Sequence, residues 1–176
     1  MRGFLNGVVF TIALLVAAAV SGVLVGALPS GADSKPIPME KLAANASLHA
    51  TIARETRGVT NPLQPTSDNL VAGVKLYGAN CAVCHGTSDG KASKLAQGFY
   101  IKSPQLATDG VEDDPAAVTH WKVVHGIRFS AMPSFKGTLS DDEFWKITMF
   151  VKAMDKLPPA ADAEWKKLPS AAAPTT

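Results

Sequence analysis

The sequence predicts an all-α protein, in which a small helical domain follows an N-terminal transmembrane helix. Three observations support this fold class. A run from Phe4 to Leu28 carries no charged residue, residues 68–157 combine helix caps with apolar residues at helical spacing, and no stretch of useful length alternates apolar and polar residues. The last observation argues against a sheet, since a half-buried strand needs that alternation.

Residues 1–28 are the first element, and we expect them to be a transmembrane anchor. The uncharged run is about 25 residues long, and a helix needs roughly 20 to cross a bilayer core. A signal peptide is the alternative, since small residues such as Ser30 follow the run, although signal sequences have shorter apolar regions. Both interpretations place residues 29–176 outside the cytoplasm. With Arg2 before the run, we expect a single pass of the cytoplasmic (inner) membrane and a periplasmic domain.

Two features bear on partners. Ala18, Gly22 and Gly26 recur every four residues and would let a second transmembrane helix approach closely, although Ala and Gly are common throughout this segment. The net charge of +2 is too small to favour nucleic acid as a partner.

Residues 29–67 are expected to be a linker that contains a helix at 39–57. Its start, PSGADSKPIP, is rich in Pro, Gly and Ser, and Gly58 is a stop signal for the helix. The apolar stripe of this helix is thin, so the sequence predicts that it packs on a partner more than on its own domain.

Residues 68–157 are expected to form the compact domain. Ser67 or Asp68 would cap its first helix, and Asp114 would cap the helix AAVTHWKVVH, which Pro115 opens and Gly126 closes. Lys91 to Asp113 is expected to be loop with one short turn. The last helix begins with a capping box of Ser140 and Glu143 and keeps its apolar spacing until Pro158. Residues 158–176 are rich in Ala and Pro, so we expect an irregular tail in which Trp165 is a possible docking residue.

The segment CAVCH contains the chain's two cysteines, Cys81 and Cys84, followed directly by His85. A disulfide of the redox type is one interpretation, but no strand precedes the pair. A zinc site is another, but it would have to recruit scattered histidines. The third is covalent attachment of haem. Cysteines three apart project to one side of a helical turn and can bond the two vinyl groups, and the next residue can then donate an imidazole nitrogen to iron. We favour one covalent haem c.

The opposite face of the haem needs a second iron ligand, and Met132 is the strongest candidate. It lies in the loop SAMPSF, where Pro133 prevents a helix, so its thioether can be presented to a metal. Four other side chains are possible: His120 and His125, which share a helix, and Met149 and Met154, which core packing explains more simply.

Residues 68–157 resemble a class I cytochrome c of the monohaem, CxxCH type, and HGIRFSAMPSF is similar to membrane-attached bacterial members. The resemblance implies that Cys81 and Cys84 hold the haem, with His85 and Met132 as axial ligands. It implies a close crossing of the first and last helices at Gly73 and Tyr77, near Phe150. It also assigns residues around the haem: the Pro104 carbonyl would accept a hydrogen bond from His85, Leu106 would pack on the porphyrin, and Arg128 would lie near a propionate.

The expected function is one-electron transfer in a respiratory or photosynthetic chain rather than enzymatic catalysis. The carrier would connect a quinol-oxidising complex or dehydrogenase with a terminal oxidase or reaction centre. A stationary cytochrome subunit of such a complex is the alternative, favoured by the helix at 39–57. A haem sensor or peroxidase-like enzyme is a third hypothesis, and it requires that Met132 does not bind iron.

Overall fold

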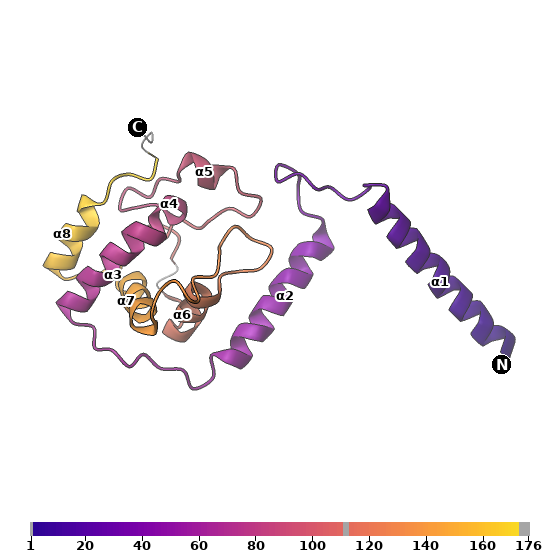
Figure 1. The fold of residues 1–176 in the computed structure, drawn as a ribbon, viewed down its shortest axis with the longest axis horizontal. Coiled ribbons are helices and arrows are strands. Elements are labelled where there is room, and N and C mark those ends of the chain that lie inside the picture. The colour runs from indigo at the N-terminus through magenta and orange to yellow at the C-terminus, as the bar shows by residue number, and fades with distance from the viewer. Residues whose placement is uncertain (1, 111–112, 173–176) are drawn as a thin grey trace. The chain divides into compact units, whose positions relative to one another are not determined.

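The computed structural model describes residues 2–110 and 113–172, and every regular element within them is a helix (Figure 1). The only strand-like pairing in these ranges is an isolated bridge between Lys136 and Leu139. The all-α prediction is therefore confirmed. The chain divides into two compact units between Lys35 and Pro36.

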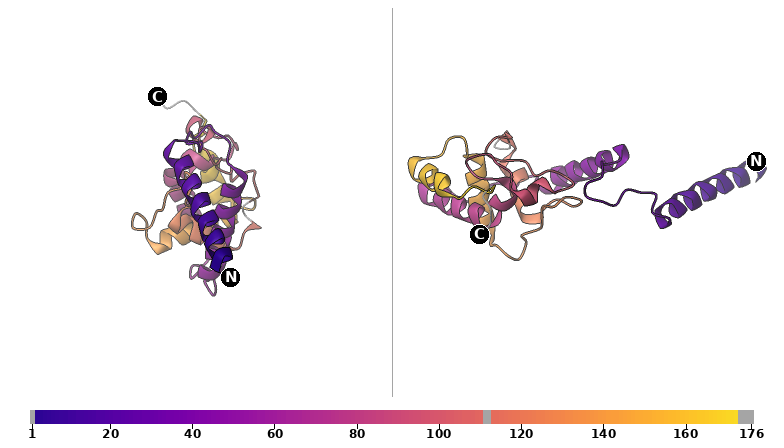
Figure 2. Two further views of the ribbon diagram at one scale, coloured as in Figure 1. Left: turned by 90° about the vertical axis from the view of Figure 1, so that its right-hand side faces the viewer. Right: turned by 90° about the horizontal axis from the view of Figure 1, so that it is seen from above.

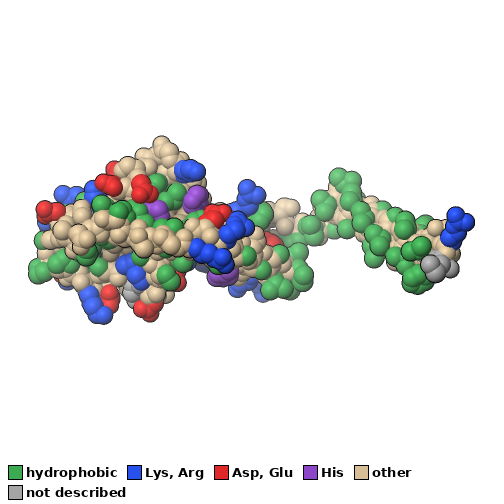
Figure 3. All heavy atoms as spheres, turned by 90° about the horizontal axis from the view of Figure 1, so that it is seen from below, with side chains coloured by type: hydrophobic (Ala, Val, Ile, Leu, Met, Phe, Trp, Pro, Cys, Tyr) green, Lys and Arg blue, Asp and Glu red, His purple; other side chains and the backbone are tan. Residues whose placement is uncertain are grey.

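The first unit contains α1 (Arg2–Leu24), a helix of 23 residues that is long and apolar enough to cross a membrane. At 1.5 Å per residue it spans about 35 Å, close to the thickness of a bilayer core. Apolar side chains surround it (Figure 3). Gly26 lies beyond the end of α1, in the turn that closes it, so the proposed small-residue face keeps only Ala18 and Gly22 on the helix.

The core of the second unit is the crossing of α3 (Ser67–Asn80) and α7 (Asp141–Lys152). A Cβ atom on Gly73 would collide with the carbonyl oxygen of Lys146, so only glycine allows this separation of the backbones. Beside the crossing, the rings of Tyr77 and Phe150 meet edge to face with centroids 5.2 Å apart. The structure thus confirms the close approach expected at Gly73 and Tyr77.

The helix caps agree with the sequence in one case and differ in two. The capping box of Ser140 and Glu143 at the start of α7 is present. At α3 the cap is Thr66, one residue earlier than expected, and its hydroxyl accepts a hydrogen bond from the Asn69 amide at 3.2 Å. At α6 (Ala116–His125) the predicted cap Asp114 is wrong, because the helix begins one residue later and Pro115 is its N-cap residue. The Asp114 carboxylate instead accepts a hydrogen bond from Lys122 Nζ at 2.7 Å.

The C-terminal segment differs most from the expectation. Residues 159–167 are not an irregular tail but form α8 (Pro159–Lys167), which lies along α3 (Figure 2). Trp165 is 5% exposed, and its ring packs edge to face on Tyr77 and on Phe150 at 5.5 and 5.1 Å. One large aromatic side chain thus buries enough apolar surface to dock this helix, which the Ala- and Pro-rich composition of the segment did not predict.

Three shorter or flanking helices complete the second unit. α2 (Pro38–Glu55) matches the helix expected at 39–57, but it belongs to the compact unit and contacts α6, so it is not part of a free linker. α4 (Ala82–His85) and α5 (Lys94–Gln97) are single turns, and α5 is the short turn expected between Lys91 and Asp113.

Candidate functional site

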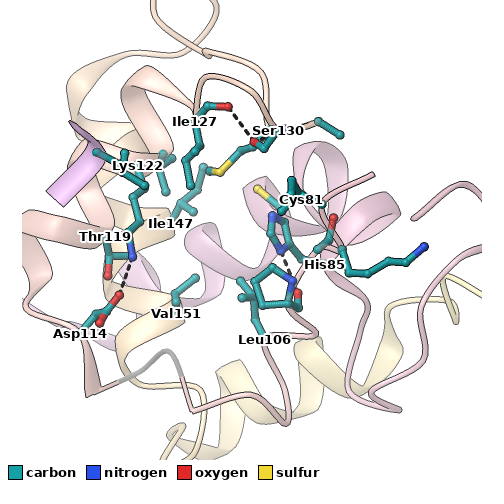
Figure 4. A pocket seen from close by; sticks show the side chains of 18 of the residues that line it. Cys81, His85, Leu106, Asp114, Thr119, Lys122, Ile127, Ser130, Ile147 and Val151 are labelled. Carbon is teal, nitrogen blue, oxygen red and sulfur yellow. Dashed lines mark hydrogen bonds and ion pairs between the residues drawn. The ribbon is translucent and has the colours of Figure 1, made fainter. Parts of the chain in front are cut away.

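A cavity of about 280 Å³ opens among α2, α3, α4, α6 and α7 and the loops that precede and follow α6 (Figure 4). Its walls are mostly apolar, and they include Tyr77, Ile101, Leu106, Val123, Ile127, Ile147 and Val151. The residues that line it also include the thiol of Cys81, the imidazole of His85 and the thioether of Met132. The structure therefore brings both predicted iron ligands, which are far apart in the sequence, to one cavity.

The cysteine segment is shaped by the end of one helix and the start of another. Cys81 terminates α3, its amide donating to the Tyr77 carbonyl at 2.8 Å, and α4 follows as one turn in which the His85 amide donates to the Cys81 carbonyl at 2.9 Å. Cys81 lines the cavity, whereas Cys84 is half-buried beside it. Both thiols are free.

The environment of these thiols argues against the two alternatives to haem attachment. Burial raises the pKa of Cys81 to about 12, and burial also raises the pKa of Cys84. Disulfide exchange needs a thiolate, which this environment disfavours. In residues 2–110 and 113–172, moreover, no group of three or more His, Cys, Asp or Glu side chains is placed to hold a metal ion.

His85 is held in one orientation by the loop that precedes α6. Its Nδ1 lies 2.9 Å from the Pro104 carbonyl oxygen, and its own carbonyl accepts a hydrogen bond from the Leu106 amide at 3.2 Å. Burial lowers the pKa of His85, with the Pro104 hydrogen bond acting in the opposite direction. The lowered pKa favours the neutral imidazole. Because the Pro104 carbonyl can only accept a hydrogen bond, Nδ1 is the protonated nitrogen, and Nε2 keeps the electron pair that a metal needs.

Met132 is held by a braced loop after α6. The Ile127 amide donates to the Met132 carbonyl at 3.1 Å, and the Met132 amide donates to Ser130 Oγ at 3.1 Å. Gly126 has φ of +67°, and a Cβ there would lie 2.6 Å from the Met132 carbonyl oxygen and collide with that of Pro133. Gly126, expected only to end a helix, therefore also allows the methionine loop to cross the end of α6.

The other four candidates for the second ligand do not line the cavity. Met149 is buried in the core and Met154 packs on it. His120 stacks on Trp145 with ring centroids 3.9 Å apart, and its Nε2 lies 3.2 Å from Asp141. His125 is exposed beside Trp121. Within the described residues, Met132 is thus the only methionine in the cavity wall, and His85 the only histidine.

Two lysines, Lys102 and Lys122, line the cavity, whereas Arg128 does not. Arg128 is exposed and lines a smaller neighbouring hollow, not the cavity. Thr119 and Lys122 line the cavity instead, on the side away from Cys81 and His85 (Figure 4), and Lys122 pairs there with Asp114. A signal was available in the sequence, because Thr119, Lys122 and Val123 lie at i, i+3 and i+4 of the predicted helix and share one face.

These residues fit a haem. The cavity combines two cysteines in one helical turn, an oriented imidazole, a thioether, apolar walls and a polar side that holds the Lys122–Asp114 ion pair. Sequence comparison points the same way. Residues 68–151 match the family described as cytochrome c oxidase, cbb3-type, subunit III. Cytochrome c6 of Leptolyngbya boryana is 36% identical over 86 residues, which is 47% of this chain and 89% of the relative.

The chain belongs to the class I c-type cytochromes. Cytochrome c6 of Anabaena variabilis is also similar, with 34% identity over 54% of this chain and 96% of the relative, and so is that of Diacronema lutheri, with 31% identity over 47% and 93%. A search of solved structures returned no significant match. This cytochrome therefore carries one covalent haem c and transfers electrons, as the sequence predicted. The matched segment begins after α2 and ends before α8, so both helices lie outside it.

Proposed function

We propose that this cytochrome holds its haem through thioethers to Cys81 and Cys84, with His85 Nε2 and the Met132 sulfur as the axial ligands. The observation that carries the proposal is that Cys81, His85 and Met132 line a single apolar cavity. Haem bound in this way supplies one-electron chemistry at its iron. Pro104 keeps the imidazole oriented through the Nδ1 contact, and Leu106 provides an apolar contact for the porphyrin.

The polar side of the cavity would face the haem carboxylates. With the vinyl-bearing edge of a haem attached at Cys81 and Cys84, its two propionates would lie toward the opposite edge. Thr119 and the Lys122–Asp114 ion pair lie on that side of the cavity (Figure 4), where the Lys122 ammonium group would donate a hydrogen bond to a carboxylate. We propose that Lys122 takes the role expected of Arg128.

Ligation by His85 and Met132 favours electron transfer over chemistry at the iron. A protein that fills both axial positions leaves none for dioxygen or peroxide, and it changes little in geometry when the oxidation state changes. The half-buried, hydrogen-bonded setting of His85 and the braced loop of Met132 both oppose ligand loss. The sensor and peroxidase hypotheses would require Met132 to leave the iron.

Replacement of Met132 tests this assignment. We expect Met132→Ala to remove the methionine–iron absorption band, to allow carbon monoxide to bind the reduced protein and to lower the midpoint potential. Met154→Leu, which changes a methionine outside the cavity wall, is the matched control and should leave all three properties unchanged. An unaltered spectrum in Met132→Ala would overturn the proposed ligand.

We further propose that α1 is retained as a single-pass anchor in the cytoplasmic membrane, with the haem domain on its outer side. The length and apolar surface of α1 support this, and Arg2 before the run supports a cytoplasmic N-terminus. The test is N-terminal sequencing of the mature protein from washed membranes. A mature chain that begins after Leu28 would show cleavage and contradict the anchor.

In this arrangement the domain would carry electrons between a quinol-oxidising complex or dehydrogenase and a terminal oxidase or reaction centre. Likeness to cytochrome c6 supports a mobile carrier. A second candidate is a stationary subunit of an oxidase, which the matched family's description favours. Migration in a native gel after extraction in mild detergent distinguishes the two, since a carrier should migrate alone and a subunit should migrate with other haem proteins.

A further inference from the structure

α2 lies outside the family-matched segment, yet it is attached to the haem domain at both ends. Near its start, the Tyr100 hydroxyl donates to Glu40 Oε1 at 2.9 Å, and at its last residue Trp121 Nε1 donates to Glu55 Oε2 at 2.8 Å. Ile52, one turn before the second contact, is 5% exposed. The helix is therefore held along its length against the domain rather than at one point.

Between these attachments, α2 contributes to the cavity itself. Asn45 and Leu48 line the same space as Cys81, His85 and Met132. They are three residues apart, so they share one face of the helix, and Ile52 continues that face four residues later. The same two residues also line the smaller hollow next to the loop that carries Ile127 and Ser130, both of which line the main cavity too.

Resting on the proposed haem site, we infer that α2 is a resident wall of the haem cavity, in which Leu48 faces the cofactor and keeps water from it, while Asn45 lies at the exposed edge of that wall. A wall at this place would affect the reduction potential of the haem. The oxidised haem carries one more positive charge than the reduced haem, and removal of water disfavours the more charged state. By excluding water, α2 raises the reduction potential through burial, without changing either axial ligand.

The two apolar leucines of α2 give a matched pair of variants. Leu48 is half-buried at the cavity, whereas Leu42 of the same helix is 64% exposed and does not line it. In the full-length haem protein, purified from membranes in detergent, we expect Leu48→Gln to lower the midpoint potential while the methionine–iron absorption band is kept. Leu42→Gln should leave the potential of the parent protein unchanged. Equal potentials in the two variants would overturn the inference.

If the Leu48→Gln variant fails to fold or to attach haem, a second pair of changes tests the same inference. The double variant Tyr100→Phe, Trp121→Phe keeps both rings and removes the two donors to α2. We expect faster tryptic cleavage at Lys41 together with a lower midpoint potential. Faster cleavage with an unchanged potential would show that α2 is not a cavity wall. Absence of the methionine–iron band from the parent protein would contradict the proposed ligands instead, so the two failures are distinguishable.

Discussion

α2 and α8 flank the family-matched segment on its two sides, and both pack on the haem domain, but by different forces. α8 is held by apolar burial, because Trp165 inserts beside Tyr77 and Phe150 in the centre of the core. α2 is held by two hydrogen bonds at its ends and a single buried residue, Ile52. The difference suggests a division of roles, in which α8 stabilises the fold while α2 acts mainly on the environment of the haem.

The largest effect that this comparison predicts is on stability and concerns α8. Trp165→Ala should lower the free energy of unfolding by about 3–5 kcal/mol, since it removes a large buried aromatic side chain and leaves a cavity. Chemical denaturation of the haem protein, followed by circular dichroism, measures the change. Trp165→Phe, which keeps an aromatic ring between Tyr77 and Phe150, should cost less. A loss smaller than that in Ile52→Ala would contradict the larger contribution of α8 to stability.

Ile52→Ala makes the corresponding change in α2. We expect a loss of about 2 kcal/mol, at the low end for a buried isoleucine, because Ile52 is the only buried residue of its helix and the loss is limited to the docking of α2. Hydrogen exchange should show faster exchange of α2 amides with α3 and α7 unchanged. Equal acceleration in all three helices would mean that α2 unfolds together with the core.

Trp121→Phe is a smaller change, at the contact with the C-terminal end of α2. It removes the donor to Glu55 and keeps a ring on α6, so the free energy of unfolding should fall by less than in Ile52→Ala. Exchange of the last-turn amides of α2 should still accelerate, since this contact holds that end. Tyr100→Phe is the matched variant at the other end of α2, and it should act on the first turn instead. The same exchange pattern in both variants would contradict two separate attachments.

The smallest effect is a pH dependence confined to α2. The pKa of Glu55 is lowered by its hydrogen bond from Trp121 and then by Arg54, with His125 as a further basic neighbour. Because the folded-state pKa lies below the ordinary value of 4.5, this carboxylate contributes stability that is complete above about pH 4.5. That contribution is lost as the pH falls through the lower, folded-state pKa.

Hydrogen exchange measured from pH 6 to pH 3, corrected for its intrinsic pH dependence, tests this sign. Protection of α2 should fall at acid pH before that of α8, since apolar packing of Trp165 does not titrate. In the Glu55→Gln variant, the protection of α2 amides should no longer differ between pH 6 and pH 3. Loss of protection in α8 at the same pH would show that the two helices are not held by different forces.

Much of the site could be predicted because its signals are local. The CAVCH pattern specifies two cysteines and a histidine within one helical turn, and Met132 stands out because Pro133 keeps it in a loop. His85 and Met132 both line the cavity. The choice between Arg128 and Lys122 was not local. Lys122 belongs to the predicted helix and Arg128 follows it by three residues. Only the path of the chain after Gly126 places Arg128 at the neighbouring hollow and not at the cavity.

The sequence by itself determined the helical class, the capping box of α7, the haem attachment motif and the close crossing at Gly73. Each of these depends on residues within a few positions of one another, or on a family pattern. The tertiary structure alone decided that Trp165 completes the core and that Leu48 faces the cavity. The physical reason is that burial is a property of the space between elements, and side chains distant in the sequence fill that space only once the chain has folded.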